Sequence, residues 1–301
     1  MSVSISRPPR RRASGTSSLE ARALRVGGVV LTLLVWVGGL ACIFPMIWTA
    51  VSAFRPDSDF LVSPFAVNTR DLTLSNYNLV FAQADFGTGF KNTAIQVGFI
   101  LATTLFFCPL AGFGFAKFTF RGKRVLFALM VLTLFFVPVT QYIPLLVEMN
   151  TIGWVDTYQG LIVPMAITSF GVFWMSGAIA AIPDELIQAA RIDGCGHFGS
   201  WWHIVMPVIK PALVSLGVVT FLGAYNDYFW PLLILRSTGK QTIQIFLSLL
   251  QTSPSVPVVA FTSNWGPLLA GSTIVLLPTV IIFLLMQRYF VSGLLQGGIK
   301  G

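Results

Sequence analysis

The sequence predicts an all-α integral membrane protein with six transmembrane helices. Of the 301 residues, 55% are apolar and only 10% are charged, and the mean hydropathy is +0.79. A soluble domain carries about 25% charged residues, so this chain uses lipid as part of its solvent. Apolar stretches of about 20 residues are long enough to cross a bilayer, and their lack of strict alternation favours helices over barrel strands. The expected spans are 27–51, 93–116, 125–147, 159–181, 212–235 and 267–290.

The basic residues predict which ends of these spans face the cytoplasm. With six spans and both termini inside, 14 of the 19 Lys and Arg residues fall in inner segments and five in outer segments. Cytoplasmic loops are enriched in Lys and Arg, so the net charge of +8 reflects topology rather than nucleic-acid binding. The orientation is therefore predicted as N-in and C-in. The inner segments are 1–26, 117–124, 182–211 and 288–301.

Three regions are expected along the chain. Residues 1–25 are rich in Ser, Pro and Arg, and we predict a disordered, basic cytoplasmic tail there. The first span exceeds the core of about 7–15 residues of a signal peptide, so we expect a retained anchor. A six-helix transmembrane domain is predicted for 26–290, and a cytoplasmic C-terminal tail for 291–301.

The third and fourth spans carry residues that shape helix packing. Pro138 and Pro144 flank Gln141 in the third span. A proline within a span frees a backbone carbonyl that neighbours or water must bind. These prolines indicate either a bend that lines a cavity or a packing kink. The fourth span is rich in Gly, Ala and Ser, which allow close helix approach, so we expect it in the interior.

The fifth span contains the one carboxylate deep in an apolar run, that of Asp227. An ionisable residue within a span is a candidate functional group. Asp227 either lines a path for a solute or forms a structural hydrogen-bond hub with Asn226. The aromatic residues around it either stack on a solute or belong to the interfacial belt, and the belt is the interpretation we prefer for Trp230.

A comparatively polar island at 182–211 lies between two apolar spans on the predicted cytoplasmic side. Pro183 suits the start of a helix, and Asp184 and Glu185 in its first turn interact favourably with the helix dipole. The predicted apolar side of this helix consists of Leu186, Ile187, Ala189, Ala190 and Ile192.

The second half of the island predicts a turn and another short helix. Asp193 and Gly194 are expected to end the first helix, because Gly tolerates the left-handed conformation that a helix end often needs. The next helix is expected at 197–206, before Pro207. Two short helices joined by a Gly turn make a compact knob that fits a cleft in a cytoplasmic partner. The alternative is a re-entry loop without a partner.

The sequence contains no catalytic or metal-binding motif. Cys42, Cys108 and Cys195 have neither metal-ligand nor disulfide spacing. The GxxxxGK[ST] phosphate loop does not occur. We interpret His197 and His203 as surface or interface residues rather than metal ligands. The chain is therefore expected to bind no cofactor and not to hydrolyse ATP by itself.

The island resembles the EAA loop of MalG-like permeases, which are subunits of carbohydrate-uptake ABC importers. The likeness extends over 25–301 through the stretches FPMIWTAVSAFRP, YNDYFWPLLIL and QRYFVSGLLQGGIKG. It implies a type I importer permease fold in which the island docks on an ATPase. The family's glutamate is Gln188 here, so a salt bridge becomes a neutral hydrogen bond at best. The implied docking residues are Gln188, Ala189, Ala190, Asp193, Gly194, Ile204 and Pro207.

The resemblance also implies partners, location and cargo. The expected partners are a second homologous permease, a dimer of ABC ATPases that binds ATP and Mg, and an extracytoplasmic solute-binding protein, in a bacterial or archaeal cytoplasmic membrane. The cargo is expected to be a di- or oligosaccharide. The expected substrate path contains Gln141, Tyr225, Asn226 and Asp227. The C-terminal Gln296, Gly297 and Gly298 are expected to reach toward the ATPases.

Three other functions are alternatives. One is a permease of the same architecture for another polar solute, such as glycerol phosphate. Another is an ion-coupled carrier, which would show internal repeats and several intramembrane charges. The last is a membrane enzyme or scaffold, which would need a polar catalytic cluster at one face.

Overall fold

The computed structural model describes residues 18–56, 60, 72–83, 85–250 and 265–298. All regular secondary structure in these residues is helical, as predicted. The chain divides into two compact units, Met1–Val51 and Ser52–Gly301. Within the described residues, four helical stretches are long and apolar enough to cross a membrane, and the number rises to six if each of two bent helix pairs is one span. The sequence expectation of six spans corresponds to this upper number.

The first unit is dominated by α1 (Ser18–Ser52), which has 35 residues and contains Pro45. At 1.5 Å per residue its length is about 52 Å, more than a hydrocarbon core of about 30 Å requires. The helix begins before residue 26, where the transmembrane domain was predicted to start. The predicted tail at 1–25 is therefore helical from Ser18, and residues 1–17 lie outside the described part.

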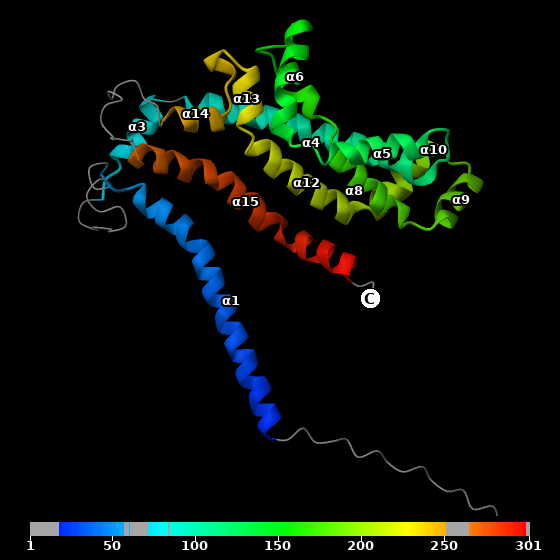
Figure 1. Ribbon diagram of the computed structural model, residues 1–301, viewed down its shortest axis with the longest axis horizontal. Coiled ribbons are helices and arrows are strands. Elements are labelled where there is room, and N and C mark those ends of the chain that lie inside the picture. The colour runs from blue at the N-terminus through cyan, green and yellow to red at the C-terminus, as the bar shows by residue number, and fades with distance from the viewer. Residues whose placement is uncertain (1–17, 57–59, 61–71, 84, 251–264, 299–301) are drawn as a thin grey trace, which may run out of the picture. The chain divides into compact units, whose positions relative to one another are not determined.

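The second unit is built on α4 (Phe86–Lys117). This helix packs against α8 (Ser169–Ala180) and α12 (Lys210–Tyr225), and α12 also packs against α15 (Trp265–Gly298) (Figure 1). Near the predicted outer end, α3 (Ser75–Gln83) packs on α15, and α14 (Ile243–Leu249) packs on α4 and α15. The helix α15 extends through the predicted C-terminal tail as far as Gly298.

Two predicted spans are interrupted. The third consists of α5 (Lys123–Thr133) and α6 (Pro138–Thr151), which meet at 106°. Pro138 clashes with a helical carbonyl four residues earlier and pushes the preceding residue toward extended backbone. Val137 accordingly has ψ 123°. Pro138 thus lies at a sharp break rather than a mild kink, whereas Pro144 is accommodated inside α6.

The fifth predicted span, 212–235, is also shorter than expected. The helix α12 ends at Tyr225, and α13 (Phe229–Ile234) follows after a break. Pro231 disfavours a continuous helix here, because its ring would meet the carbonyl of Asp227. The 16 residues of α12 measure about 24 Å, less than the full hydrocarbon core.

The fourth predicted span, 159–181, contains α7 (Tyr158–Ile162), a 3₁₀ turn (Val163–Met165) and α8. Its small residues permit close packing, as predicted. A Cβ atom on Gly112 of α4 would lie 2.9 Å from the Cβ of Met175. Ser176 is buried beside it, whereas Phe173 and Trp174 on the other side of α8 are exposed. The fourth span is therefore interior on one face only.

Contacts between the connecting segments agree with the predicted sidedness. The inner segments meet where Lys117 binds the backbone oxygen of Ile182 and the carboxylate of Asp184. The outer segments meet where Asp156 accepts hydrogen bonds from Arg236 and Ser237. Segments that are predicted to lie on the same side of the membrane are therefore in contact in the second unit.

We predict that Gly112→Ala lowers the free energy of unfolding by about 1–3 kcal/mol, the usual cost of overpacking a well-packed contact. The measurement is the thermal midpoint of the purified protein in detergent. Gly114→Ala is the matched control, because nothing lies within 4 Å of a Cβ there. It should be neutral or slightly stabilising. Equal midpoints for the two variants would contradict the close α4–α8 contact.

Candidate functional site

The predicted knob is formed by residues 182–209 at the inner end of α4 and α8 (Figure 1). It contains α9 (Asp184–Ile192), α10 (His197–Ser200), a π-helix (Trp201–Val205) and α11 (Met206–Val208). The chain then bends by 80° into α12. We call these residues the inner knob.

Lys117, at the end of α4, fixes the start of the inner knob. Its ammonium donates to the backbone oxygen of Ile182 and lies 2.6 Å from Oδ1 of Asp184. The Lys117 side chain is 8% exposed and that of Asp184 is 69% exposed. One cation therefore binds a carbonyl left free after α8 and the first acidic residue of α9. This contact connects α4, α8 and α9.

The helix α9 has one buried face and one exposed face. Ile187 and Ala190 are buried, and Ile187 belongs to a core cluster with Trp201 and Val205. Gln188, Ala189 and Ile192 lie on the opposite side, and Ile192 is 87% exposed. The five apolar residues predicted for one side of this helix are therefore divided between a buried face and an exposed face. Leu186, Ala189 and Ile192 are presented outward, as an uncovered apolar surface.

The turn after α9 has the predicted form. Gly194 has φ +86°, and its N–H donates to the carbonyl of Arg191 at 3.1 Å. The N–H of Cys195 donates to the carbonyl of Ala190 at 2.9 Å. These two bonds form a Schellman motif, which a residue with a side chain accommodates only with strain. The turn fixes the direction in which α10 leaves.

The second half of the inner knob differs from the prediction. The helical run continues through Pro207 to Val208, because a π-helix accommodates the proline. The N–H of Met206 donates to the carbonyl of Trp201, five residues earlier in the chain. Pro207 has no backbone N–H and therefore leaves no donor without a partner at this position. Ile204 is half-buried and Pro207 is exposed. Phe198 and Trp202 add exposed aromatic area to the knob.

Both histidines lie on the inner knob and make local contacts. Nδ1 of His197 lies 2.9 Å from Nη2 of Arg191, and its ring centroid is 4.9 Å from that of Phe118. Nδ1 of His203 lies 3.1 Å from the carbonyl oxygen of Gly199. Within the described residues, no group of three or more His, Cys, Asp or Glu side chains is placed to hold a metal ion.

Three of the four residues predicted along a substrate path, Tyr225, Asn226 and Asp227, lie at the break between α12 and α13. Tyr225 is buried, and its hydroxyl donates to the carbonyl of Val275 at 2.7 Å. Asn226 is exposed and donates to the carbonyl of Leu222 in its own helix. These bonds do not join Asn226 to Asp227, so they do not form the hub considered as an alternative.

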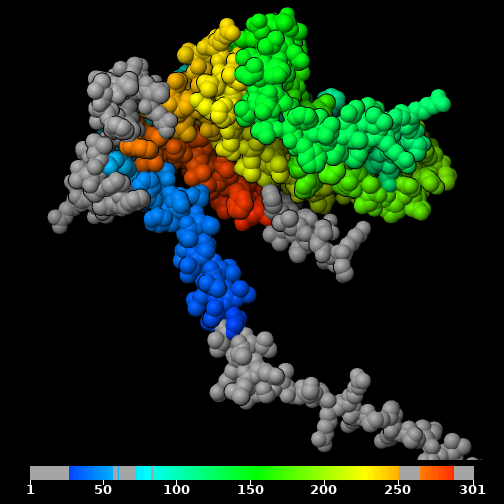
Figure 2. All heavy atoms as spheres, in the orientation of Figure 1, coloured from blue at the N-terminus to red at the C-terminus, as the bar shows by residue number. Residues whose placement is uncertain are grey.

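Asp227 and Gln141 lie on neighbouring elements. The carboxylate of Asp227 accepts from the backbone N–H of Trp230 at 3.4 Å, at the start of α13. The rings of Tyr142 and Trp230 are 5.7 Å apart, which places α6 beside α13 (Figure 2). Gln141 is exposed on α6. The third and fifth predicted spans thus meet through Tyr142 and Trp230, which lie close in sequence to Gln141 and Asp227.

The C-terminal prediction is described only in part. The backbone of α15 is helical through Gln296, Gly297 and Gly298, but their side chains lie outside the described residues.

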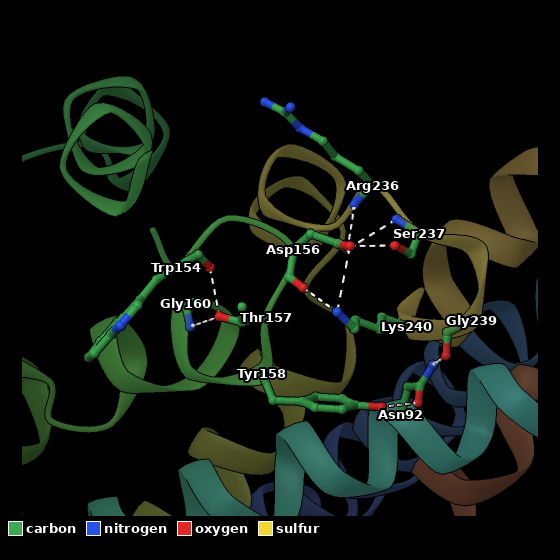
Figure 3. Close-up of polar contacts among 10 residues, drawn as sticks. All are labelled: Asn92, Trp154, Asp156, Thr157, Tyr158, Gly160, Arg236, Ser237, Gly239 and Lys240. Carbon is green, nitrogen blue, oxygen red and sulfur yellow. Dashed lines mark hydrogen bonds and ion pairs between the residues drawn. The ribbon is translucent and has the colours of Figure 1, made fainter. Parts of the chain in front are cut away.

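An outer hub, which sequence reasoning missed, surrounds Asp156 (Figure 3). Oδ1 of Asp156 accepts from the backbone N–H groups of Arg236 and Ser237 at 3.0 Å, and Oδ2 accepts from the Ser237 hydroxyl. The ammonium of Lys240 lies 3.6 Å from Oδ2. The hydroxyl and N–H of Ser237 lower the pKa of Asp156 to about 2, with help from Arg236 and Lys240. Asp156 has φ +58°, a conformation that Asp tolerates.

A second set of bonds connects the outer hub to α4. The hydroxyl of Tyr158 donates to Oδ1 of Asn92 at 2.6 Å. Nδ2 of Asn92 donates to the carbonyls of Gly239 and Gln241. In the sequence, Asp156 stands out only as part of an Asp-Thr pair before a helix. Nothing there indicates that it binds Ser237, which lies 81 residues later. The guanidinium of Arg236 extends away from the hub (Figure 3).

The family described as the binding-protein-dependent transport system inner membrane component matches residues 109–296. The arabinooligosaccharides transport system permease protein AraQ of Bacillus subtilis (strain 168) is 32% identical over 277 residues, 91% of this chain and 96% of the relative. The trehalose/maltose transport system permease protein MalG of Thermococcus litoralis is 31% identical over 286 residues, 93% of this chain and 97% of the relative.

Solved structures share the fold. A chain of a bacterial ABC transporter involved in import of the acidic polysaccharide alginate superposes with a TM-score of 0.77 at 24% identity, covering 89% of this chain and 98% of that chain. A chain of the alginate transporter in complex with an alginate pentasaccharide-bound periplasmic protein gives a TM-score of 0.62 at 16% identity, covering 89% and 94%.

We predict that Asp156→Asn lowers the free energy of unfolding at pH 7 by about 1 kcal/mol, a modest value because the group is partly solvated. Asn also tolerates positive φ, so the change tests the charge. The folded pKa of about 2 lies below an unfolded value of about 3.9. The stabilisation is therefore complete above about pH 4 and disappears as the pH falls toward 2. Thermal midpoints of both proteins should converge at low pH, and a constant difference would contradict this assignment.

Proposed function

This chain belongs to the family of binding-protein-dependent transport system inner membrane components, and on that premise we propose that it is the transmembrane permease subunit of an ATP-driven sugar importer. The fold is that of a type I ABC importer permease, shared with the alginate transporter over 98% of the solved chain. The family relatives AraQ and MalG carry names that assign them oligosaccharide or disaccharide transport. We propose a di- or oligosaccharide as cargo and a bacterial or archaeal cytoplasmic membrane as location.

The inner knob is the observation that carries this proposal. It presents Gln188, Ala189 and Ile192 on one exposed face of α9, while Ile187 and Ala190 fix the opposite face to the core. A protein interface needs an apolar centre in contact with its partner, and this face supplies one. We propose that it seats in a cleft of an ABC ATPase, where Gln188 provides a neutral hydrogen bond.

The inner knob is attached to several membrane-spanning helices, and through these attachments a partner could move the spans. Lys117 connects α9 to α4 and α8, and the 80° bend at Ile209 connects the π-helix to α12. A displacement of α9 is therefore transmitted to three helices together. In this proposal ATP and Mg bind to a dimer of ATPases, and this subunit contributes no catalytic group.

The remaining partners are proposed from the two faces of the molecule. A second homologous permease would complete the pore. The alginate transporter binds a periplasmic solute-binding protein, and a corresponding protein would dock on the outer side of this chain. The outer hub supports that role, because it holds the backbone of Arg236 and Ser237 in place while the Arg236 side chain remains exposed.

We predict that Gly194→Arg abolishes copurification of the ATPase while the second permease and the binding protein remain. Arg is strained at φ +86° and would redirect α10. The measurement is mass spectrometry of complexes purified in mild detergent from native membranes.

Two glycine variants provide controls for this experiment. Gly196→Ala lies two residues away in open space without positive φ and should retain the ATPase. Gly153→Arg strains an outer turn at φ +74° and should also retain it. A wild-type chain that purifies alone would reject the importer assignment. Retention of the ATPase by Gly194→Arg would reject docking through this turn.

We also predict that Gln141→Ala and Asp227→Asn each reduce uptake about tenfold, the effect of losing one well-placed polar contact. Asn keeps an acceptor for the N–H of Trp230, so α13 should survive. Initial rates with radiolabelled arabinotriose or maltotriose, whichever the intact complex imports, give the comparison. Asn150→Ala, also exposed on α6, is the control. Unchanged uptake in both variants would remove these residues from the path.

A further inference from the structure

An apolar groove lies between α4, α12 and α15, apart from the outer hub and next to the inner knob, whose Met206 also lines it. Its volume is about 510 Å³. The helix α12 packs against both neighbours (Figure 1), and its residues form the floor of the groove. Leu101 and Leu105 line one side, Ile282 and Met286 the other, and Val214 and Phe221 the floor.

Lys210 is the charged residue in this lining. It is the first residue of α12 and is exposed. Within the described residues its side chain makes no ion pair and no hydrogen bond. Position 210 belongs to an inner segment in the predicted topology, so the ammonium lies at the cytoplasmic headgroup level. A positive charge therefore sits at the inner end of an apolar groove.

The length of the groove matches one leaflet. From Lys210 to Phe221 the helix rises by eleven residues, or about 16 Å. Half of a hydrocarbon core of about 30 Å is about 15 Å. A groove with this depth, an apolar lining and a cation at the headgroup end has the shape and charge of a binding site for one phospholipid.

We propose that this groove binds an anionic phospholipid of the cytoplasmic leaflet, with the phosphate on Lys210 and one acyl chain along Val214, Gly217 and Phe221. Anionic headgroups are attracted to basic residues near the membrane surface, and basic pockets between spans on the cytoplasmic side are known to hold them. The lipid fills the space between α12 and α15 and adds contacts to a helix that is short for its span. The inference is independent of the cargo and of the ATPase.

The test compares two lipids with the same acyl chains. The full-length chain, purified with the subunits that accompany it and then delipidated, is titrated with dioleoylphosphatidylglycerol or dioleoylphosphatidylcholine, and bound lipid is counted by native mass spectrometry. Wild type should bind the anionic lipid more tightly. Lys210→Gln should weaken that binding about fivefold, the contribution of one lysine near the surface, and leave phosphatidylcholine unchanged.

Two variants separate the headgroup contact from the acyl-chain contact. Lys91→Gln removes an exposed lysine at the outer end of α4 and should change neither lipid. Gly217→Leu fills the groove and should weaken both lipids. A Cβ at Gly217 meets Leu105 only at ordinary contact distance, 3.6 Å, so the fold should persist, as the thermal midpoint can verify.

Three results would overturn the proposal. One is equal binding of the two lipids by wild type. Another is an equal loss in Lys210→Gln and Lys91→Gln. The third concerns the variant Val214→Cys. If this cysteine crosslinks to a copurifying subunit while lipid binding stays insensitive to Lys210→Gln, the groove is a protein interface.

Discussion

The arrangement of the second unit depends on one constraint, that backbone N–H and C=O groups in a membrane must find partners within the protein. The helices after α4 are interrupted repeatedly, and each interruption frees such groups. Side chains of α4 bind many of them. Thr104 donates to the carbonyl of Ala166 before α8, and Lys117 donates to Ile182 after it. Asn92 donates to Gly239 and Gln241 in the outer segment.

Other breaks are satisfied by side chains from the broken elements themselves. The indole of Trp230 donates to the carbonyls of Gly160 and Leu161. The hydroxyl of Tyr225 donates to Val275, which is three residues before Pro278 in α15. A proline weakens the helical hydrogen bonds of the preceding turn, so an external donor is favourable there. The polar and aromatic residues of the fifth span therefore have structural partners as well as a position beside α6.

This bonding pattern gives the two ends of α4 different roles. At the inner end, Lys117 joins α4, α8 and α9 at the surface proposed to dock on a partner. At the outer end, Asn92 and Tyr158 join α4 to a hub in which Asp156 orders the backbone of the 236–240 segment. Between the ends, close contact at Gly112 leaves little room for sliding between α4 and α8. A movement at one face is therefore carried to the other by a stiff element.

The sequence by itself determined the fold class and the location of the knob, because these follow from local composition, and it predicted the sidedness. The length of the apolar segments, the distribution of Lys and Arg, and the Asp193-Gly194 turn can all be recognised in the sequence without knowledge of tertiary contacts. Tertiary structure decided which face of α9 is buried and that Asp156 meets Ser237. Each of these depends on partners far away in the chain. The alternation of apolar residues in α9 could not show that Ile187 has a neighbour in Trp201 whereas Ile192 has none in the described core.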